Sequence, residues 1–326
     1  MSDDLCSIVV IGFNESGRLR ESLDSALAVR DAGHAAEVLF VDGGSSDGSV
    51  EIAESCAVDE IIGSSERRSA AANRNVGWRH TRSDLIQFLD ADMDLDLNWI
   101  ASASKVLAAN PACAAVCGEI RERRPTLWAR VFQLDWRRTP GPIAYCGGAA
   151  LFRRSALDAV DGFPEDVPYG EEPLLCWHIR NDLEFTIEFV AAPMVTHDLA
   201  FAGFGDYWRR CMRVGETQAS VAARCWHTSD PLWRSETTRG LVWPLLYFAA
   251  AAVLVFAPPV FKIAIVAAIL FLLIRKSAQT FGSGQTASVA CAYAAHTYFA
   301  KIPIGLGIAG WILRRPQSET DATRKT

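Results

Sequence analysis

One long apolar stretch, residues 241–274, constrains the fold of this chain more than any other feature. Its only charged residue is Lys262. A single membrane crossing needs about 20 apolar residues, so the stretch is too long for one crossing and sufficient for two short ones. Pro258 and Pro259 interrupt it near its middle, and proline breaks a helix because it has no backbone N–H to donate. The stretch therefore predicts a helical hairpin in a membrane.

The residues that follow the stretch predict on which side of the membrane the chain continues. Arg275 and Lys276 come directly after it, and basic residues favour the cytoplasmic side. A second apolar segment, 287–313, is interrupted by His296 and Lys301. We expect this segment to be re-entrant, interfacial or a short hairpin, which returns the tail to the cytoplasm. A buried helical core in a soluble protein is the alternative interpretation of both segments.

The composition changes near residue 240, which divides the chain into three parts. We expect a catalytic domain at 1–235, a membrane region at 236–315 and a polar tail at 316–326. The formal net charge of −6 argues against a general nucleic-acid binder. The nine cysteines include no C-x-x-C pair, which indicates buried free thiols in a reducing compartment. The acidic start of the chain is unlike a signal peptide, so we expect the catalytic domain to be cytoplasmic.

The first part alternates short apolar runs with helical patterns. The runs are "CSIVVIG", "EVLFVDGG", "EII" and "DLIQFLDAD". This alternation predicts an α/β fold, a parallel sheet with helices on both faces. Ligands of such sheets bind outside the carboxyl ends of the strands. Asn14, Asp42 and Asp90 all fall at predicted strand ends, so we expect a binding site there.

A group of acids follows the last of these runs, in "FLDADMD" at 88–94. Mg²⁺ and Mn²⁺ prefer carboxylate oxygens, commonly one or two from the protein with substrate phosphates completing the shell. Asp90 and Asp92 offer that arrangement, and such a metal neutralises a diphosphate leaving group. By itself the D-x-D pattern is weak, because acidic turns after strands are common.

Six motifs in order give the pattern a context. They are "SIVVIGFNE", "FVDGGSSDGS", "RSAAANRNVG", "FLDADMD", "GGAALFRRSALDAVDGF" and "GEEPLLCWHIR". Together they resemble family-2 inverting glycosyltransferases of the GT-A fold, over about residues 6–215. The resemblance implies a Rossmann-like nucleotide-sugar-binding domain and transfer of a sugar from a nucleotide donor. The Q-x-x-R-W motif of the processive synthases is absent from the sequence, which favours single additions.

The resemblance also assigns the donor site. It places Phe13, Asn14, Glu15 and Asp42 around the nucleotide. The family often has a second acid after the position of Asp42, where this chain has Gly43. That departure affects how the protein would recognise the nucleotide base. A UDP-sugar is the favoured donor, and a GDP-sugar is the alternative.

Further donor-side residues follow from the later motifs. The helix motif implies that Arg74 and Asn75 lie near the nucleotide, and the D-x-D motif assigns Asp90, Ala91 and Asp92 to the donor and its Mg²⁺ or Mn²⁺. Some relatives use a histidine at the position of His197 as an additional metal ligand. A solvated surface arginine and a structural histidine are the plainer readings of Arg74 and His197. We further expect Arg210 and Arg213 to contact the diphosphate or lipid headgroups.

The last motif implies the catalytic base. Glu171 and Glu172 match an acidic pair that begins the acceptor-side helix in the family. Glu172 occupies the position of the catalytic base in that pair. A base removes the proton of the acceptor hydroxyl as that oxygen attacks the anomeric carbon. Stabilisation of a helix N-terminus by two acids is the alternative.

These observations predict a membrane-anchored inverting glycosyltransferase of the inner membrane. Its acceptor is a hydroxyl of a lipid-linked molecule or a glycan, in envelope polysaccharide or glycolipid synthesis; membrane lipids are further partners. A polyprenyl-phosphate glycosyltransferase is the first alternative. A catalytically idle, membrane-tethered sugar-nucleotide-binding scaffold is the alternative from another class.

Overall fold

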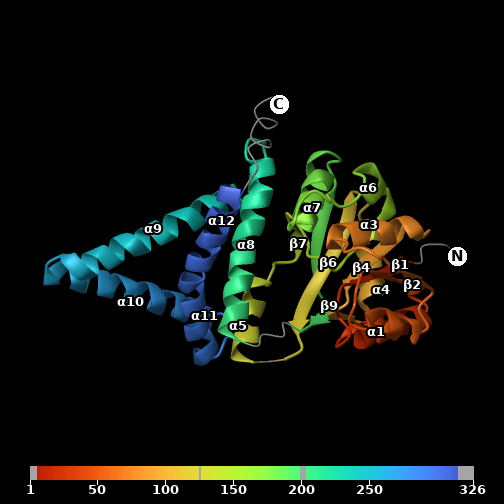
Figure 1. Cartoon of the computed structure of the whole chain (residues 1–326), viewed down its shortest axis with the longest axis horizontal. Coiled ribbons are helices and arrows are strands. Elements are labelled where there is room, and N and C mark those ends of the chain that lie inside the picture. The colour runs from red at the N-terminus through yellow and green to blue at the C-terminus, as the bar shows by residue number, and fades with distance from the viewer. Residues whose placement is uncertain (1–5, 125, 199–202, 315–326) are drawn as a thin grey trace. The chain divides into compact units, whose positions relative to one another are not determined.

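The computed structural model describes residues 6–124, 126–198 and 203–314. The chain forms two compact units (Figure 1). The first contains the chain up to Arg124 together with the stretch that begins at Trp136, and the second contains the short segment before Trp136 and the helices from Phe204 onward. The helix 204–225, which the sequence analysis assigned to the catalytic domain, thus groups with the carboxy-terminal helices.

A single sheet of nine strands forms the centre of the first unit, in the order β3-β2-β1-β4-β8-β6-β9-β5, with β7 paired to β9. Its first half is entirely parallel, as the alternating pattern predicts. The strands of this half are β1 (Cys6–Gly12), β2 (Ala35–Asp42), β3 (Glu60–Ile62) and β4 (Leu85–Asp90). The sequence of these strands is continuously apolar because helices cover both of their faces.

The second half of the sheet mixes directions. Here β8 runs antiparallel to β4 and β6, whereas β6 and β9 are parallel to each other. The short β5 and β7 both run antiparallel to β9. The strands of this half are β5 (Met93–Leu95), β6 (Cys113–Glu122), β7 (Gly141–Pro142), β8 (Ala150–Arg153) and β9 (Thr186–His197).

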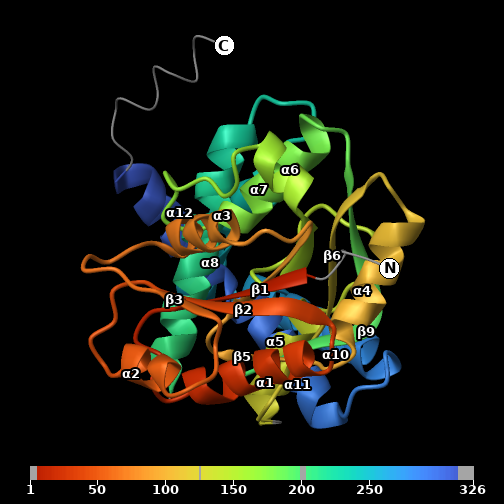
Figure 2. The ribbon, with the colours of Figure 1, turned by 90° about the vertical axis from the view of Figure 1, so that its right-hand side faces the viewer.

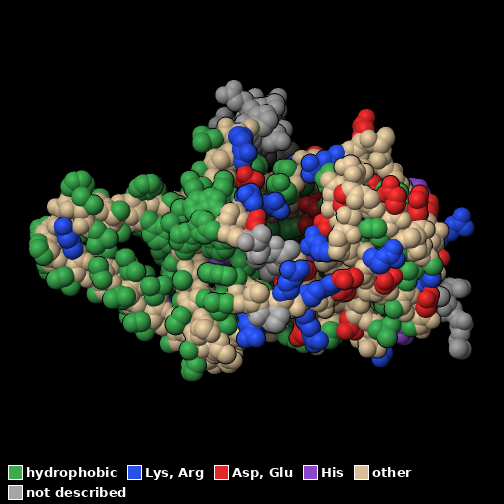
Figure 3. Space-filling model, turned by 60° about the horizontal axis from the view of Figure 1, so that its bottom comes forward, with side chains coloured by type: hydrophobic (Ala, Val, Ile, Leu, Met, Phe, Trp, Pro, Cys, Tyr) green, Lys and Arg blue, Asp and Glu red, His purple; other side chains and the backbone are tan. Residues whose placement is uncertain are grey.

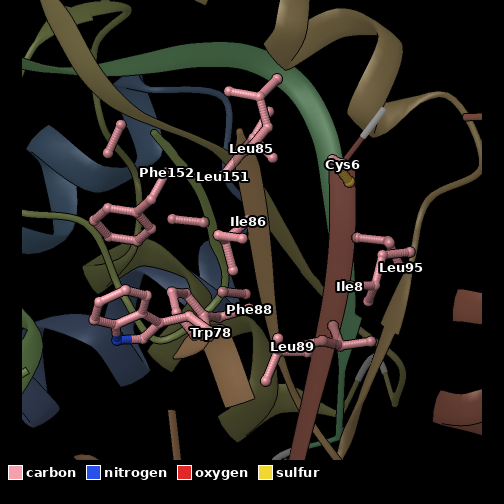
Figure 4. Close-up of a cluster of buried hydrophobic side chains, with 14 of the residues drawn as sticks. Cys6, Ile8, Trp78, Leu85, Ile86, Phe88, Leu89, Leu95, Leu151 and Phe152 are labelled. Atoms are coloured by element: carbon pink, nitrogen blue, oxygen red, sulfur yellow. The ribbon is translucent and has the colours of Figure 1, made fainter. Parts of the chain in front are cut away.

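Helices cover the sheet on both faces, and Figure 2 shows α1 and α2 on one side of β1 and β2 and α3, α6 and α7 on the other. They are α1 (Leu19–Asp31), α2 (Ser49–Glu54), α3 (Ala70–His80), α4 (Trp99–Ala109), α6 (Arg154–Ala159) and α7 (Glu171–Asn181). The core between them is apolar on both sides of the strands (Figure 4). Phe88 meets Phe152 edge to face, with ring centroids 5.8 Å apart. Ile8 and Leu95 lie on the opposite side of β1.

The described residues of the second unit form helices and no strand. It consists of α5 (Leu127–Asp135), α8 (Phe204–Cys225), α9 (Arg234–Phe256), α10 (Pro259–Gly282), α11 (Ala287–Phe299) and α12 (Lys301–Arg314). Glycines let α12 lie directly on α8. A Cβ on Gly307 would sit 2.0 Å from the carbonyl oxygen of Met212, and one on Gly215 would sit 2.0 Å from that of Ile304. Small residues permit this close approach of helix backbones, as they do in membrane bundles.

The apolar stretch forms two helices, because α9 ends at Phe256 and α10 begins at Pro259. Their large side chains are widely exposed, including Phe248 at 76% and Phe256 at 86% (Figure 3). Of the helices in the described ranges, α9 alone is long and apolar enough to cross a membrane. A second crossing by α10 stays a prediction. The segment 287–313 forms α11 and α12, and the tail 316–326 lies outside the described residues.

Candidate functional site

The carboxyl ends of β1, β2 and β4 lie side by side. Gly12 is in register with Asp42, and Ile11 is in register with Asp90. The loops that follow these strands therefore start from one edge of the sheet. This is the edge at which the sequence predicts a binding site.

Hydrogen bonds fix the two loops after β1 and β2 to each other. The Asn14 N–H donates to Ser45 Oγ at 2.8 Å, and Asn14 Oδ1 accepts from the Ser46 N–H at 2.9 Å. The Ser16 N–H donates to Asp47 Oδ2 at 2.9 Å. Asn14 adopts φ 56°, a left-handed conformation that asparagine tolerates better than most residues. The residues Asn14 and Ser16 thus fix this loop to the one after β2. The guanidinium carbon of Arg67 lies 4.6 Å from the ring centroid of Phe13.

Asp42 is buried, and only one of its two carboxylate oxygens accepts hydrogen bonds. Its Oδ2 accepts them from the N–H groups of Gly44 and Ser45 at 2.9 and 2.8 Å. Its Oδ1 is buried and has no hydrogen-bond partner among the described residues. The neighbouring Gly43 has no room for a side chain, since a Cβ there would meet Asn73 Nδ2 at 2.7 Å. The departure from the family pattern at Gly43 is therefore accompanied by Asn73 in the space that a second acid would need.

Arg74 joins three carboxylates at the centre of the site. It projects from α3 with 2% of its side chain exposed. Its Nη2 lies 2.7 Å from Asp90 Oδ1 at the end of β4 and 3.3 Å from Glu172 Oε1, and its Nη1 lies 2.9 Å from Glu171 Oε1. The structure thus brings together four residues that the sequence analysis singled out from three separate motifs.

The charges in this cluster shift one another's pKa values. Burial, the neighbouring Glu171 and Asp90 raise the pKa of Glu172 to about 7, against the opposing effect of Arg74. Burial also raises the pKa of Asp90, although Arg74 partly offsets it. For Arg74, burial lowers the pKa and the three carboxylates outweigh it, so its pKa is raised and it stays charged. Glu172 is therefore a carboxylate whose affinity for a proton suits a base near neutral pH.

Gly148 borders the cluster from the loop before β8. A Cβ at this position would lie 2.5 Å from Arg74 Nη2, 2.8 Å from Asp90 Oδ2 and 3.0 Å from Glu172 Oε1. The neighbouring Gly147 has nothing within 4 Å of a Cβ. Only the second glycine of the pair is thus required for the cluster to close, a distinction that the sequence does not make.

A second group of charges surrounds Asp92. Its Oδ2 lies 3.3 Å from His197 Nε2 and 3.7 Å from Arg18 Nη1. β5 and the end of β9 pair antiparallel, with Met93 opposite His197, which brings the imidazole to the D-x-D turn. Despite the effect of burial, the hydrogen bond and charge of His197 and the charge of Arg18 lower the pKa of Asp92. Asp92 thus stays ionised beside the histidine that the resemblance implied.

These residues offer two metal ligands rather than three. Within the described ranges, no group of three or more His, Cys, Asp or Glu side chains is placed to hold a metal ion. Asp90 Oδ1 accepts a hydrogen bond from Arg74, whereas Asp92 pairs with His197. His197 Nδ1 is buried, has no hydrogen-bond partner among the described residues, and lies 4.0 Å from Glu122 Oε2. A carboxylate and an imidazole suit Mn²⁺ when donor phosphates complete its shell.

Asn75 and Ala91 are built into the scaffold of the site. The Asn75 Nδ2 donates to the carbonyl oxygen of Phe163 and to Glu165 Oε1, both at 2.8 Å, and its Oδ1 accepts the Phe163 N–H at 2.8 Å. Every polar atom of the amide is therefore used to hold the loop after α6. Ala91 is 2% exposed, and its N–H donates to the carbonyl oxygen of Ile11.

Arg210 and Arg213 belong to the second unit, on α8. The guanidinium of Arg210 lies 5.5 Å from the ring centroid of Phe132, and Arg213 is exposed. Their predicted contact with a diphosphate or with lipid headgroups stays a prediction.

Arg18 was not singled out by the sequence analysis, yet it contributes a cation to the site. Its Nε donates to Glu15 Oε2 at 3.1 Å, and its Nη1 donates to the Asp198 carbonyl oxygen at 3.2 Å. Burial raises the pKa of Glu15, although the charge of Arg18 partly offsets it. The signal for Arg18 was its spacing, three residues after Glu15, but that pattern is common on exposed helices.

Part of the chain is similar to known glycosyltransferases. Residues 7–161 match the family model described as "Glycosyl transferase family 2". This part of the chain is similar to family-2 glycosyltransferases. The chain is 31% identical over 171 residues to an undecaprenyl-phosphate 4-deoxy-4-formamido-L-arabinose transferase of Pseudomonas paraeruginosa, covering 48% of this chain and 49% of that protein. It is 26% identical over 244 residues to a pre-mycofactocin glycosyltransferase of Mycobacterium tuberculosis, covering 70% of this chain and 50% of that protein.

The chain spans about half the length of the curated relatives that it matches. Solved structures share the GT-A fold of the family-2 domain. The mannosyltransferase PcManGT of Pyrobaculum calidifontis, in complex with GDP-Man and Mn²⁺, aligns with a TM-score of 0.61 at 21% identity, covering 92% of this chain and 90% of that one. S. aureus TarS 1-349 in complex with UDP aligns with a TM-score of 0.52 at 13% identity, covering 96% and 93%.

Proposed function

We propose that this protein is a membrane-anchored inverting glycosyltransferase that moves one sugar from a nucleotide donor to a hydroxyl of a lipid-linked or glycan acceptor. The observation that carries the proposal is the cluster around Arg74. It joins the first acid of the D-x-D motif to Glu172, whose pKa of about 7 fits a catalytic base. The family-2 domain supplies the reaction class.

The donor is a UDP- or GDP-sugar in this proposal. Asp42 offers a buried carboxylate oxygen with no hydrogen-bond partner in the described part of the chain, and a buried acceptor of this kind is costly unless a ligand satisfies it. Uracil and guanine each carry an imide-type N–H that suits it. The rigid loops of Phe13, Asn14 and Glu15 would border the nucleotide. Arg18 would lie on the diphosphate side, beside Asp92.

A divalent cation, Mg²⁺ or Mn²⁺, would be held by Asp92 and His197, with Asp90 as a further carboxylate. When bound, such an ion supplies positive charge to the diphosphate as it departs. Arg18 lies 3.7 Å from Asp92 Oδ2 and adds a fixed cation at the same place. Asp90 remains held by Arg74, which keeps its carboxylate oriented.

Glu172 would act on the acceptor. One of its oxygens takes the proton of the acceptor hydroxyl, while the hydroxyl oxygen forms the new bond to the anomeric carbon. The bond between that carbon and the diphosphate oxygen breaks, and the nucleoside diphosphate leaves with the electron pair. Arg74 is a positioning residue, since it holds Glu172 and Asp90 together and limits the rise in the pKa of Glu172. Gly148 would let an acceptor approach the cluster.

The proposed location is the inner membrane, with the catalytic domain in the cytoplasm and an acceptor in envelope polysaccharide or glycolipid synthesis. The long apolar α9 and the exposed apolar side chains of α10 support membrane attachment. Basic residues follow the stretch at Arg275 and Lys276, where the cytoplasmic side is favoured.

A polyprenyl-phosphate acceptor is the second candidate. It is favoured by the names of relatives, among which several are undecaprenyl-phosphate sugar transferases. A phosphate monoester is already ionised near neutral pH and needs no base, so this candidate leaves the raised pKa of Glu172 without a use. For that reason the hydroxyl acceptor is preferred.

Two measurements on the purified full chain test the proposal. Thermal unfolding is followed with a panel of UDP- and GDP-sugars, with and without Mn²⁺, and one donor should raise the midpoint only when the metal is present. Radiolabelled donor is then incubated with membrane lipid extract. Metal-independent protection, or label that appears only as free sugar, would contradict the proposal.

A further inference from the structure

The helical unit contains two neighbouring cavities that no part of the proposed reaction uses. The first, of about 410 Å³, lies between α9, α10 and α11 and is called the hairpin cavity here; Figure 3 shows the opening between the two apolar arms. The second, of about 470 Å³, is lined by aromatic side chains of α5, α8 and α11 and is called the aromatic cavity. Ala295 and Phe299 line both of them, so the two cavities are adjacent along α11.

We propose that the hairpin cavity, continued by the aromatic cavity, binds the long hydrocarbon chain of the acceptor lipid. That the lipid is the acceptor rests on the proposed function. The chemistry of the lining makes the occupant a hydrocarbon: the hairpin cavity is bounded by side chains such as Leu246, Ile269 and Leu272. Its size falls in the usual range for ligand pockets, about 300–1,000 Å³.

The tyrosine hydroxyls and the imidazole beside the cavities are already hydrogen-bonded within the protein. At the hairpin cavity, the Tyr247 hydroxyl donates to the carbonyl oxygen of Tyr298 at 2.7 Å, and the Tyr298 hydroxyl donates to that of Leu272 at 3.4 Å. At the aromatic cavity, His296 Nδ1 lies 3.0 Å from the Tyr207 hydroxyl. An occupant thus gains no hydrogen bond from these groups and is selected by its apolar surface.

The second ring nitrogen of His296 also has a hydrogen-bond partner. Its Nε2 lies 3.1 Å from Asp135 Oδ2, and the Tyr293 hydroxyl donates to Asp135 Oδ1 at 2.9 Å. The imidazole is 6% exposed. The network ties α5, α8 and α11 together, so the wall of the aromatic cavity is held without an occupant.

The volume argues against a helix of a second copy as the occupant. An α-helix with its side chains is about 10 Å wide and rises 5.4 Å per turn, so one turn fills about 400 Å³. The hairpin cavity, at about 410 Å³, would hold a single turn of a helix. A hydrocarbon chain is narrower than a helix and flexible, so it can follow the two adjacent cavities, which share Ala295 and Phe299. Within a bilayer an empty cavity would also forfeit dispersion contacts.

Two adjacent alanines provide a matched test. Ala250 lines the hairpin cavity, whereas Ala249 is exposed and lines neither cavity. Ala250→Phe should fill the space with a ring, and Ala249→Phe adds the same ring outside it. Ala295→Phe is a second cavity-filling variant in the shared wall. Circular dichroism of each variant checks that the helices are retained.

The full chain in detergent is titrated with undecaprenyl phosphate, and the bound molecules are counted by native mass spectrometry. We expect one molecule per chain, bound at least 10-fold tighter than geranyl phosphate. Ala250→Phe should weaken it at least 10-fold, and Ala249→Phe should leave it within twofold of wild type. Equal binding by both variants, equal retention of dioleoylphosphatidylglycerol, or a lipid-free dimer would each overturn the inference.

A transfer assay separates this inference from the proposed function. If the wild-type chain binds the probe as expected but transfers sugar to no lipid acceptor, the lipid site stands and the proposed function fails. If the wild type transfers sugar to a lipid acceptor and Ala250→Phe and Ala295→Phe keep its KM for that acceptor, the function stands and the inference is overturned.

Discussion

Replacing Glu172 by glutamine should make the protein more stable and less active. Both effects follow from removing one carboxylate: the gain in stability from the loss of a charge that burial disfavours, and the loss of activity from the loss of the proton acceptor. Glutamine preserves the size of the side chain and its capacity for hydrogen bonds, but it cannot ionise. Glu171→Gln is the matched control, since it makes the same change one residue earlier on α7.

The magnitude follows from the raised pKa. The pKa of Glu172 rises from 4.5 to about 7, and each pKa unit corresponds to about 1.36 kcal/mol, so ionised Glu172 costs the folded state about 3 kcal/mol. Below pH 4.5 the group is protonated in both states and the cost is absent. It grows between pH 4.5 and 7 and is complete above pH 7. Glu172→Gln should therefore be more stable than wild type by about 2–3 kcal/mol at pH 8, a rise in Tm of roughly 4–10 °C, and equally stable at pH 4.

The effect on turnover has the opposite sign. A general base contributes about 10²–10⁴-fold, so Glu172→Gln should lose at least about 100-fold in kcat while its donor affinity is kept. Wild-type kcat/KM should fall about tenfold per pH unit below pH 7, because the base must be unprotonated. Glu171→Gln should lose less, since its partner is Arg74 Nη1 at 2.9 Å and it is not the proposed base.

The assay combines thermal unfolding at pH 4, 6 and 8 with turnover on membrane lipid extract across the same range. An unchanged unfolding midpoint of Glu172→Gln at pH 8 would refute the electrostatic reasoning. Turnover within a few-fold of wild type would refute the base assignment and favour a phosphate acceptor. Because the two results are independent, either part can fail alone.

Three further predictions follow from neighbouring features. Gly148→Ala should lower kcat at least 10-fold, because its methyl group would displace Arg74, whereas Gly147→Ala should match wild type in the same turnover assay. Asp92→Asn should abolish Mn²⁺-dependent donor binding, measured by calorimetry, with an unchanged circular dichroism spectrum; full turnover at limiting Mn²⁺ would exclude the ligand role. A single cysteine at position 260 should be labelled from outside the cell, and one at position 320 only after lysis; labelling of position 320 from outside would contradict an even number of crossings.

Local sequence determined the elements and the ends of the strands in this protein. Apolar runs closed by Asp42 and Asp90 specify buried parallel strands, because the chemistry of each run decides which faces it can bury. Pro258 and Pro259 specify the break between α9 and α10 through their missing N–H groups. Such features depend on a few consecutive residues, and a single sequence carries them in full.

Tertiary structure alone decided how the acidic and basic residues act on each other. Arg74 and Glu171 are 97 positions apart in the chain yet lie 2.9 Å apart in space, and Gly148 closes the cluster from a third segment. In the folded protein Asn75 holds the loop after α6, Asp90 pairs with Arg74, and Asp92 pairs with His197. The physical reason is that Coulomb interaction and desolvation depend on distance through space and on burial. The raised pKa of Glu172 therefore depends on the packing of α7, the end of β4 and the loop of Gly148 around Arg74.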